Sequence, residues 1–348
     1  MHRFTLILAV LMLAPAASAQ ERCTMALLHY NLQYCAGGLE GMAEELGLDS
    51  GDFDWSEQAI EDQTIVESLV PVLDLLDAHP DWTMTLEMQG YMLEVIAQRH
   101  PAVLDQLRAL AEGGQAEIAS FHYSDQLFLA YPREDLDRSV QLTRDLFEEH
   151  DVPLSGVVFT QEGQFGEGVL DVMRQHGYTT AVVARNLFGT QHADYEQALY
   201  DHPMYPDVDV IVGGRSFTHE GTGASAQWTF LDDGELLATG DMNCYLGPLF
   251  VHQEWAVADY ETKVQAFVDD GYRVAGIESC VEGLKGSGVH PSTLPTMLDG
   301  AWQPEDTDNL GLWMGGAGIF GGLEGTESDN GVLTLGTRAH LTVRAAHQ

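Results

Sequence analysis

Short apolar stretches with the length of β-strands alternate along this chain with longer stretches that have the spacing of amphipathic helices. Strands are predicted at residues 24–33, 82–87, 116–121, 155–161, 180–184, 208–212 and 272–277. Helices are predicted at residues 58–78, 90–112, 133–150, 166–176 and 258–270. Strands that alternate with helices pair in parallel, because each helix returns the chain to the same edge of the sheet. The alternation predicts an α/β fold, and its length favours a distorted seven-stranded (β/α) barrel.

Two segments depart from this alternation. Residues 227–231 and 235–239 flank Asp233-Gly234, a turn typical of β-hairpins, so a hairpin insertion is predicted there. Residues 301–348 begin with a glycine-rich, irregular stretch. We expect a barrel domain over residues 20–300 and a C-terminal extension over residues 301–348 that packs on it.

The first part of the chain has the features of a secretory signal peptide. A short basic start is followed by an apolar run at residues 6–13 and by Ala17-Ser18-Ala19, a small-x-small cleavage site. Residues 1–19 are therefore predicted to be removed, which leaves Gln20 first and the protein secreted or periplasmic. No run approaches the ~18 apolar residues of a membrane-spanning helix, so membrane insertion is not expected.

The chain is strongly acidic. It has 54 Asp and Glu residues against 15 Lys and Arg residues, a formal charge of −39 at pH 7. Phosphate groups would be repelled by this charge, which argues against nucleic acid as a partner. Hydrophobic residues make up 45% of the chain, enough for a sizeable core. The oligomeric state cannot be predicted from these features.

The cysteine and glycine patterns limit the cofactors. Cys23, Cys35, Cys244 and Cys280 match no zinc motif, and in an oxidising compartment they could form one or two disulfides whose pairing stays open. Neither a Gly-x-Gly-x-x-Gly run after a strand nor a phosphate-binding loop motif is present. We therefore expect no nucleotide cofactor, and no other cofactor is predicted.

Polar side chains gather where the predicted strands end, which is the edge that carries active sites in parallel barrels. They are His29, Asn31 and Gln33 after the first strand, Glu87 and Gln89 after the second, His122 and Tyr123 after the third, Gln161, Glu162 and Gln164 after the fourth, and Glu278 after the seventh. Imidazoles, amides and carboxylates in such numbers are typical of a cleft that binds sugar hydroxyls. A carbohydrate is therefore the predicted substrate.

Glu162 is the most informative of these residues. It directly follows an apolar strand, where a carboxylate loses solvation free energy unless the site uses it. Residues 159–165 (FTQEGQF) resemble the nucleophile motif of glycoside hydrolase family 57, and His29 resembles the His of that family's opening motif. The chain also resembles the catalytic barrel of family 38, and both families share a seven-stranded barrel with polysaccharide deacetylases. The resemblance spans roughly residues 24–285.

This resemblance implies a retaining glycoside hydrolase that acts on an oligo- or polysaccharide. Glu162 would be the nucleophile, and Asp233, Asp241 and Glu278 are the candidates for the acid that protonates the leaving oxygen. The residues expected to bind the sugar are His29, Asn31, Gln33, Glu87, His122, Tyr123, Gln161 and Gln164. Asn31 stands where family 38 has a zinc-binding Asp, so no metal is predicted.

Two alternatives remain open from the sequence. The first is a metal-dependent deacetylase or mannosidase-like hydrolase with His29 and His122 near a cation. The second is a catalytically inactive carbohydrate-binding envelope protein, because no residue in the sequence is clearly the acid. The sequence does not indicate which sugar or which linkage would be bound.

Overall fold

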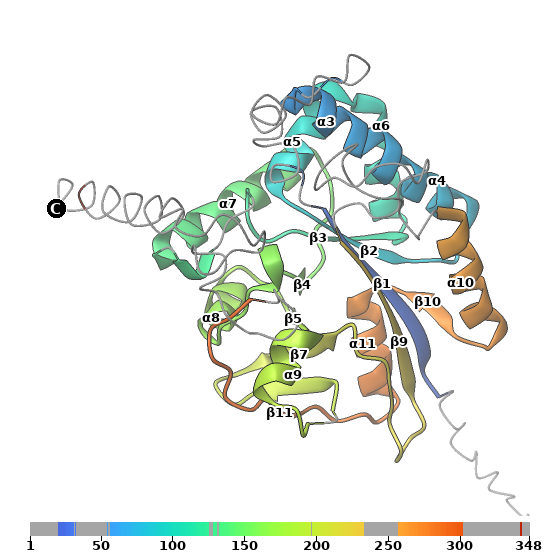
Figure 1. The fold of residues 1–348 in the computed structure, drawn as a ribbon, viewed down its shortest axis with the longest axis vertical. Helices are drawn as coiled ribbons and strands as arrows, with labels where there is room; N and C mark the ends of the chain where they lie inside the picture. Colours follow the sequence, from blue (N-terminus) through green and yellow to red (C-terminus); the bar gives the residue numbers. More distant parts are fainter. Residues whose placement is uncertain are drawn as a thin grey trace, which may run out of the picture.

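The computed structural model describes residues 20–30, 32, 54, 56–124, 128–130, 132–195, 197–232, 257–301 and 342. Within these residues, strands and helices alternate as the sequence predicts (Figure 1). The structure confirms an α/β fold built on parallel strands. The predicted signal peptide and nearly all of the predicted C-terminal extension lie outside the described residues.

The first sheet has the order β3-β2-β1-β9-β8. Its strands are β1 (Arg22–Tyr30), β2 (Met84–Met88), β3 (Ala116–Ala119), β8 (Phe217–Thr218) and β9 (Ser225–Asp232), and β10 (Arg273–Ala275) also pairs with β1. Strands β2, β9 and β10 all run parallel to β1. The central strand β1 therefore brings the ends of its neighbours to one edge.

The second sheet has the order β11-β6-β7-β5-β4. Its strands are β4 (Val157–Val158), β5 (Thr180–Ala184), β6 (Leu199–His202), β7 (Tyr205–Gly213) and β11 (Ser292–Thr293). Strands β4, β5 and β7 are parallel, whereas β6 is antiparallel to β7. The amide of Ser155 donates to the carbonyl of Ile118 at 2.9 Å, which links the edge of this sheet to β3 in the first.

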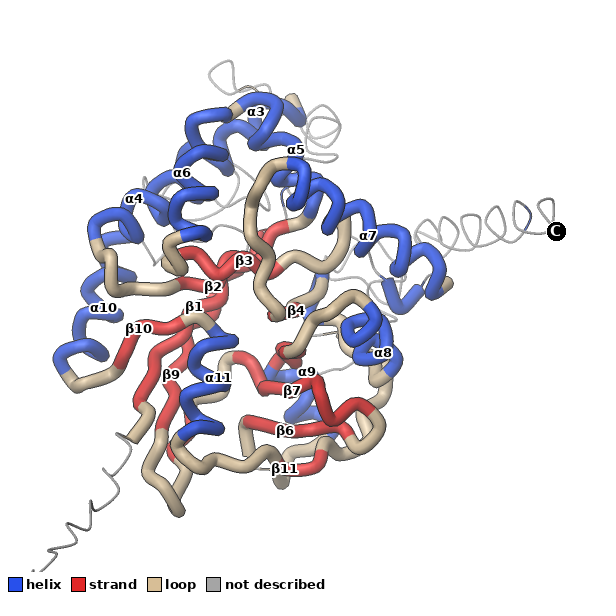
Figure 2. The backbone as a smooth tube through the Cα atoms, turned by 180° about the vertical axis from the view of Figure 1, so that it is seen from behind, coloured by secondary structure: helices blue, strands red, loops and turns tan. Residues whose placement is uncertain are grey.

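Helices cover the outer faces of both sheets (Figures 1 and 2). They are α3 (Glu57–Thr64), α4 (Val70–Ala78), α5 (Gly90–Arg99), α6 (Pro101–Glu112), α7 (Arg133–Glu149), α8 (Gly168–Gln175), α9 (Arg185–Gln191) and α10 (Val257–Asp269). The remaining helix, α11 (Ile277–Gly286), packs its buried side chains into the layer between the two sheets. A π-helical turn (Ile65–Leu69) joins α3 to α4, and 3-10 turns lie at Phe128–Ala130 and Gln161–Gly163.

The buried residues form an outer layer under the helices and an inner layer between the two sheets. In β1, Leu28 and Tyr30 pack outward against the helices. Met25 and Leu27 pack inward against Phe159 of the segment that follows β4. Because side chains alternate along a strand, His29 shares the inward face of β1 with Met25 and Leu27.

The strands form two sheets in the described residues, whereas the sequence predicted one closed seven-stranded barrel. The first arm of the predicted hairpin insertion is β9, which pairs in parallel with β1 from Arg22 to His29. Among the described residues, β9 also pairs with β8, which is antiparallel to it. The second predicted arm, at residues 235–239, lies outside the described residues.

A disulfide joins Cys23 in β1 to Cys280 in α11 across 257 residues of sequence. This is one of the pairings that the sequence left open. Cys35 and Cys244 lie outside the described residues.

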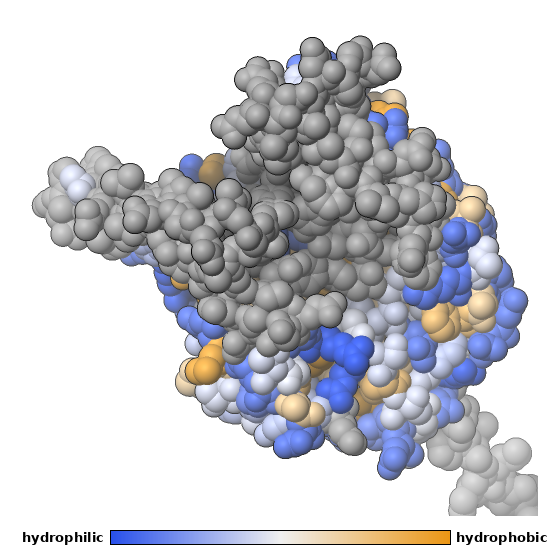
Figure 3. Space-filling view, in the orientation of Figure 1, coloured by the Kyte–Doolittle hydropathy of each residue, from blue (hydrophilic) through white to orange (hydrophobic). Residues whose placement is uncertain are grey.

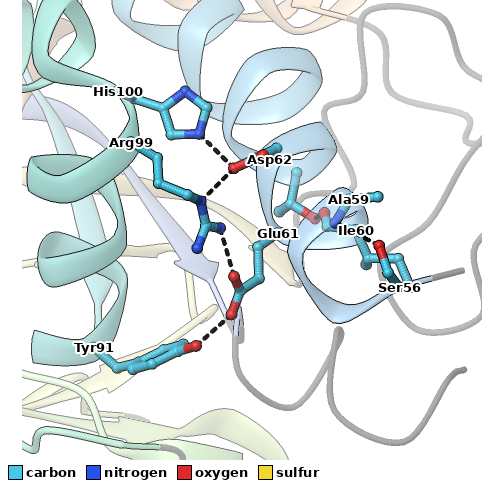
Figure 4. A network of polar contacts seen from close by, with 9 residues as sticks. Ser56, Ala59, Ile60, Glu61, Asp62, Tyr91, Arg99 and His100 are labelled. Carbon is cyan, nitrogen blue, oxygen red and sulfur yellow. Dashed lines mark hydrogen bonds and ion pairs between the residues drawn. The ribbon is translucent and has the colours of Figure 1, made fainter. Parts of the chain in front are cut away.

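A polar network ties α3 to α5 (Figure 4). The Arg99 guanidinium donates to Glu61 at 2.5 Å and to Asp62 at 2.7 Å, and His100 contacts Asp62 at 2.8 Å. The Tyr91 hydroxyl donates to Glu61 at 2.5 Å. Glu61 is only 2% exposed, so its charge depends on Arg99 for compensation.

The described surface in Figure 3 is mostly hydrophilic, with hydrophobic residues scattered across it. The exposed large hydrophobic side chains are Val66, Leu142, Tyr195, Met204 and Leu298, which come from separate stretches of the chain. Among the described residues, no helix combines the length and the apolar character needed to cross a bilayer.

Candidate functional site

The carboxyl ends of β1 and β2 place two ionisable side chains in contact. Parallel pairing sets His29 opposite Glu87, and both side chains point inward and are fully buried. The Nδ1 atom of His29 forms a hydrogen bond with the Glu87 carboxylate, and the imidazole lies edge-on to the Phe159 ring at 5.1 Å between centroids. Burial raises the pKa of Glu87, and His29 offsets part of that rise. The first two strands thus supply a buried imidazole–carboxylate pair.

The segment after β3 brings His122 to the same edge. Its Nε2 atom accepts a hydrogen bond from the backbone amide of Gln161 at 3.0 Å. The ring is fully buried, and burial, with a smaller effect from His29, lowers the pKa of His122 to about 4. The imidazole is therefore neutral near pH 7, with Nε2 as an acceptor and its proton on Nδ1.

Glu162 lies at the carboxyl end of β4, on a turn of unusual shape. Its backbone is left-handed, with φ 55° and ψ 29°, and its side chain is 1% exposed. The Gln161 amide group donates to Oε1 of Glu162 at 3.1 Å. Non-glycine residues adopt this backbone conformation rarely, and such residues concentrate at functional sites.

Several buried polar atoms around this turn have no hydrogen-bond partner among the described residues. They are Oε1 of Glu87, both amide atoms of Gln89, Nδ1 of His122 and Oε1 of Gln161. Buried polar atoms are nearly always paired, so a group of them marks a place where a polar ligand or water binds. Gln89 follows the second predicted strand, and no sequence pattern distinguished it from its neighbours.

Two predicted sugar-binding residues have other partners. The Gln164 side chain donates to the carbonyl of Gln161 at 3.1 Å and accepts from the amide of Leu129 at 3.2 Å. These two hydrogen bonds stabilise the turn. The Tyr123 hydroxyl donates to Glu94 of α5 at 2.5 Å. Both residues therefore use polar atoms in contacts within the protein.

Glu278 does not lie with Glu162. Its carboxylate accepts from Oγ1 of Thr179 at 3.0 Å and from the amide of Gly156 at 3.3 Å, and these residues precede β5 and β4. The predicted strand at 272–277 is shorter than expected, because β10 ends at Ala275 and α11 begins at Ile277. The structure therefore corrects the prediction that Glu278 belongs to the same edge as Glu162.

A further buried carboxylate lies near Glu278. Glu117 of β3 accepts from the Thr85 hydroxyl at 2.6 Å and from the amides of Ile277 and Glu278 at 2.7 Å and 3.1 Å. Burial raises its pKa to about 7 in spite of these bonds. Because it binds the first amides of α11, Glu117 caps that helix.

The other predicted site residues, Asn31, Gln33, Asp233 and Asp241, lie outside the described residues. The register of β1 and β9 sets Asp232 opposite His29, so β9 ends at the edge that carries the site. Within the described residues, no cluster of three or more His, Cys, Asp or Glu side chains could hold a metal ion.

A family match covers the part of the chain that contains the Glu162 turn. Residues 57–205 match glycosyl hydrolase family 57. The resemblance to family 57 that the sequence predicts is confirmed over this range, which includes Glu87, His122 and Glu162.

One relative is also similar to this chain over part of its length. The 4-alpha-glucanotransferase of Thermococcus litoralis is 26% identical over 111 residues, which cover 32% of this chain and 16% of that protein. The chain therefore aligns with less than a fifth of this curated relative.

Two solved structures share the fold. A GH57-type branching enzyme from Pyrococcus horikoshii has a TM-score of 0.57 at 9% identity over 83% of this chain and 74% of its own. A putative polysaccharide deacetylase from Mycobacterium smegmatis has a TM-score of 0.52 at 13% identity over 82% and 99%.

Proposed function

We propose that this protein is a retaining glycoside hydrolase that acts on α-1,4-linked glucans, with Glu162 as its nucleophile. The observation that carries the proposal is the buried carboxylate of Glu162 on its left-handed turn, inside the range that matches family 57. The substrate class follows from the name of the relative that is a 4-alpha-glucanotransferase.

In the proposed reaction, Glu162 attacks the anomeric carbon and displaces the leaving oxygen, which a carboxylic acid protonates. The same acid, now a carboxylate, takes a proton from the water that hydrolyses the glycosyl-enzyme. We favour Asp233 for this role, because it directly follows Asp232, which pairs with His29 in the register of β1 and β9. Asp241 is the second candidate.

The buried polar atoms beside the turn are proposed to bind sugar hydroxyls. Gln89 offers both a donor and an acceptor, and Oε1 of Glu87 offers an acceptor. A ring of hydroxyl groups satisfies such a mixed set, because each hydroxyl both donates and accepts. Pairing these atoms with substrate removes the free-energy cost of leaving them buried and unpaired.

The test uses maltoheptaose and proton NMR. A retaining enzyme releases first the anomer that its substrate linkage had, before mutarotation mixes the two forms. Glu162→Gln should lower kcat by at least ~10³-fold, because an amide cannot form the glycosyl ester. Glu112→Gln, at an exposed carboxylate in α6, is the matched control and should keep the wild-type rate.

Other outcomes of this test would favour other functions. Initial release of the inverted anomer would contradict the retaining mechanism. Loss of a deacetylase or mannosidase activity on chelation, with recovery on adding zinc, would support the metal-dependent alternative. Glucan binding without turnover would support an inactive carbohydrate-binding protein.

We also propose that the protein is exported. The apolar run at residues 6–13 and the small residues before Gln20 support a cleavable signal, and the Cys23–Cys280 disulfide suits an oxidising compartment. N-terminal sequencing of protein from the medium or the periplasm should begin at Gln20. An exported form that begins at Met1 would contradict cleavage.

A further inference from the structure

The turn that carries Glu162 has two successive residues in the left-handed region. Glu162 has φ 55° and Gly163 has φ 53°. For a residue with a Cβ atom, this conformation is less stable than the right-handed one, because the Cβ atom lies too close to a backbone carbonyl oxygen. Contacts around the turn must therefore hold Glu162 in this conformation.

Some of these contacts come from the turn itself. The amide of Gly163 donates to the carbonyl of Thr160 at 2.9 Å, and the amide of Gln164 donates to the carbonyl of Gln161 at 3.2 Å. His122 lies outside the turn. Its Nε2 atom accepts a hydrogen bond from the backbone amide of Gln161 at 3.0 Å. That amide is buried, so losing its acceptor would leave an unpaired donor in the interior.

Hydrogen bonds to α5 and α7 fix the backbone at His122. Its carbonyl accepts from the amide of Gly90 at the start of α5 at 3.2 Å. The amide of the next residue, Tyr123, donates to the Ser139 hydroxyl of α7 at 2.8 Å. The ring is fully buried, so its Nε2 atom has a defined position relative to the turn.

We propose that His122 is a positioning residue: its Nε2 atom holds the Gln161 amide and so keeps Glu162 in the left-handed conformation that presents its carboxylate for attack. The catalytic part of this inference rests on the proposed function of Glu162. The structural part, support of the turn through the Gln161 amide, is independent of it.

Two variants of His122 distinguish the effect of its hydrogen-bond acceptor from the effect of its ring. In His122→Gln the side-chain carbonyl can reach the place of Nε2 and accept the same bond, whereas His122→Phe keeps a ring without an acceptor. We expect the Phe variant to lose at least ~10-fold in kcat with a KM within about 3-fold of wild type, because it disturbs the nucleophile more than substrate binding. The Gln variant should keep most of the wild-type kcat.

Hydrogen exchange at the Gln161 amide is the direct readout. Exchange should be at least ~10-fold faster in His122→Phe than in wild type, and close to wild type in His122→Gln. Val140→Ala, at a buried site in α7, controls for a general loss of stability and should leave kcat unchanged. Equal protection of the Gln161 amide in the Phe variant would overturn the inference, as would equal losses of kcat in the two His122 variants.

The exchange measurement also separates the two proposals. If the wild-type protein has no activity on glucans, the proposed function fails, while faster exchange in His122→Phe still supports the role of His122 in the turn. If the Phe variant does not fold, ¹⁵N NMR of the wild-type ring decides the question. A protonated Nδ1 with an unprotonated, hydrogen-bonded Nε2 supports the inference, and a protonated Nε2 near pH 7 overturns it.

Discussion

The buried, neutral state of His122 should make the free energy of unfolding depend on pH, and His122→Gln should remove that dependence. Burial first, and the charge of His29 second, lower the pKa of His122 from its ordinary value of 6.5 to about 4. In the unfolded chain the ring takes up a proton below pH 6.5, whereas in the folded protein it stays neutral until the pH nears 4. Between these values protons favour the unfolded chain, so stability falls as the pH falls.

The size of this effect follows from the two pKa values. Relative to pH 7.5 and above, the loss in the free energy of unfolding is about 2 kcal/mol at pH 5 and about 3 kcal/mol at pH 4. The wild-type protein should lose this much stability relative to His122→Gln over the same range. Carboxylates that titrate in both proteins contribute equally to both free energies of unfolding, so their contribution cancels in the difference.

Urea unfolding followed by tryptophan fluorescence at pH 7, 6, 5 and 4 measures this difference. His290→Gln, at an exposed imidazole, controls for replacing a histidine by glutamine. If the stability of His122→Gln follows that of the wild-type protein in parallel from pH 7 to pH 4, then His122 is not held neutral by the fold. That result would refute the reasoning.

Arg99→Ala should lower the free energy of unfolding by about 2–4 kcal/mol, because it leaves the buried carboxylate of Glu61 without its cation; a urea midpoint equal to that of the wild-type protein would contradict this. The stability that Glu117 contributes is present below pH 4.5 and is lost as the pH rises through about 7, because burial raises its pKa. Glu117→Gln should thus gain up to about 3 kcal/mol over wild type between pH 4.5 and pH 8, and a difference independent of pH would argue against it. Replacing Cys23 and Cys280 together by Ser should cost about 2–5 kcal/mol in denaturant unfolding, since the bond closes a very long loop; an unchanged midpoint would exclude that contribution.

The strands and helices with strong local patterns were predictable from the sequence. The apolar run that ends at His29 and the amphipathic spacing of residues 133–150 correspond to β1 and α7. The pairing of β9 with β1 was not predictable, because the pattern of a strand does not indicate which distant strand lies beside it. The choice depends on contacts with β1, more than 190 residues earlier.

The site was predictable in outline. Their positions at the ends of predicted parallel strands placed His29, Glu87 and Glu162 at one edge, and the structure brings together the first two in a direct hydrogen bond. The position of Glu278 was not predictable, because the end of β10 depends on how far the strand follows β1 before α11 begins. The role of His122 as a hydrogen-bond acceptor was not predictable either. It depends on the left-handed turn, and the residue types at Gln161 and Glu162 do not indicate such a turn.

The place of β1 at the centre of the first sheet has a consequence for how the chain reaches its native state. One edge of β1 pairs with β2 and β10. The other edge pairs with β9, whose last residue is Asp232. Contacts between residues so distant in sequence form slowly, because the intervening loop must be closed first. We expect β1 to pair early with β2 but to stay without β9 and β10 until Arg273–Ala275 has been synthesised, so the first sheet remains incomplete during most of translation.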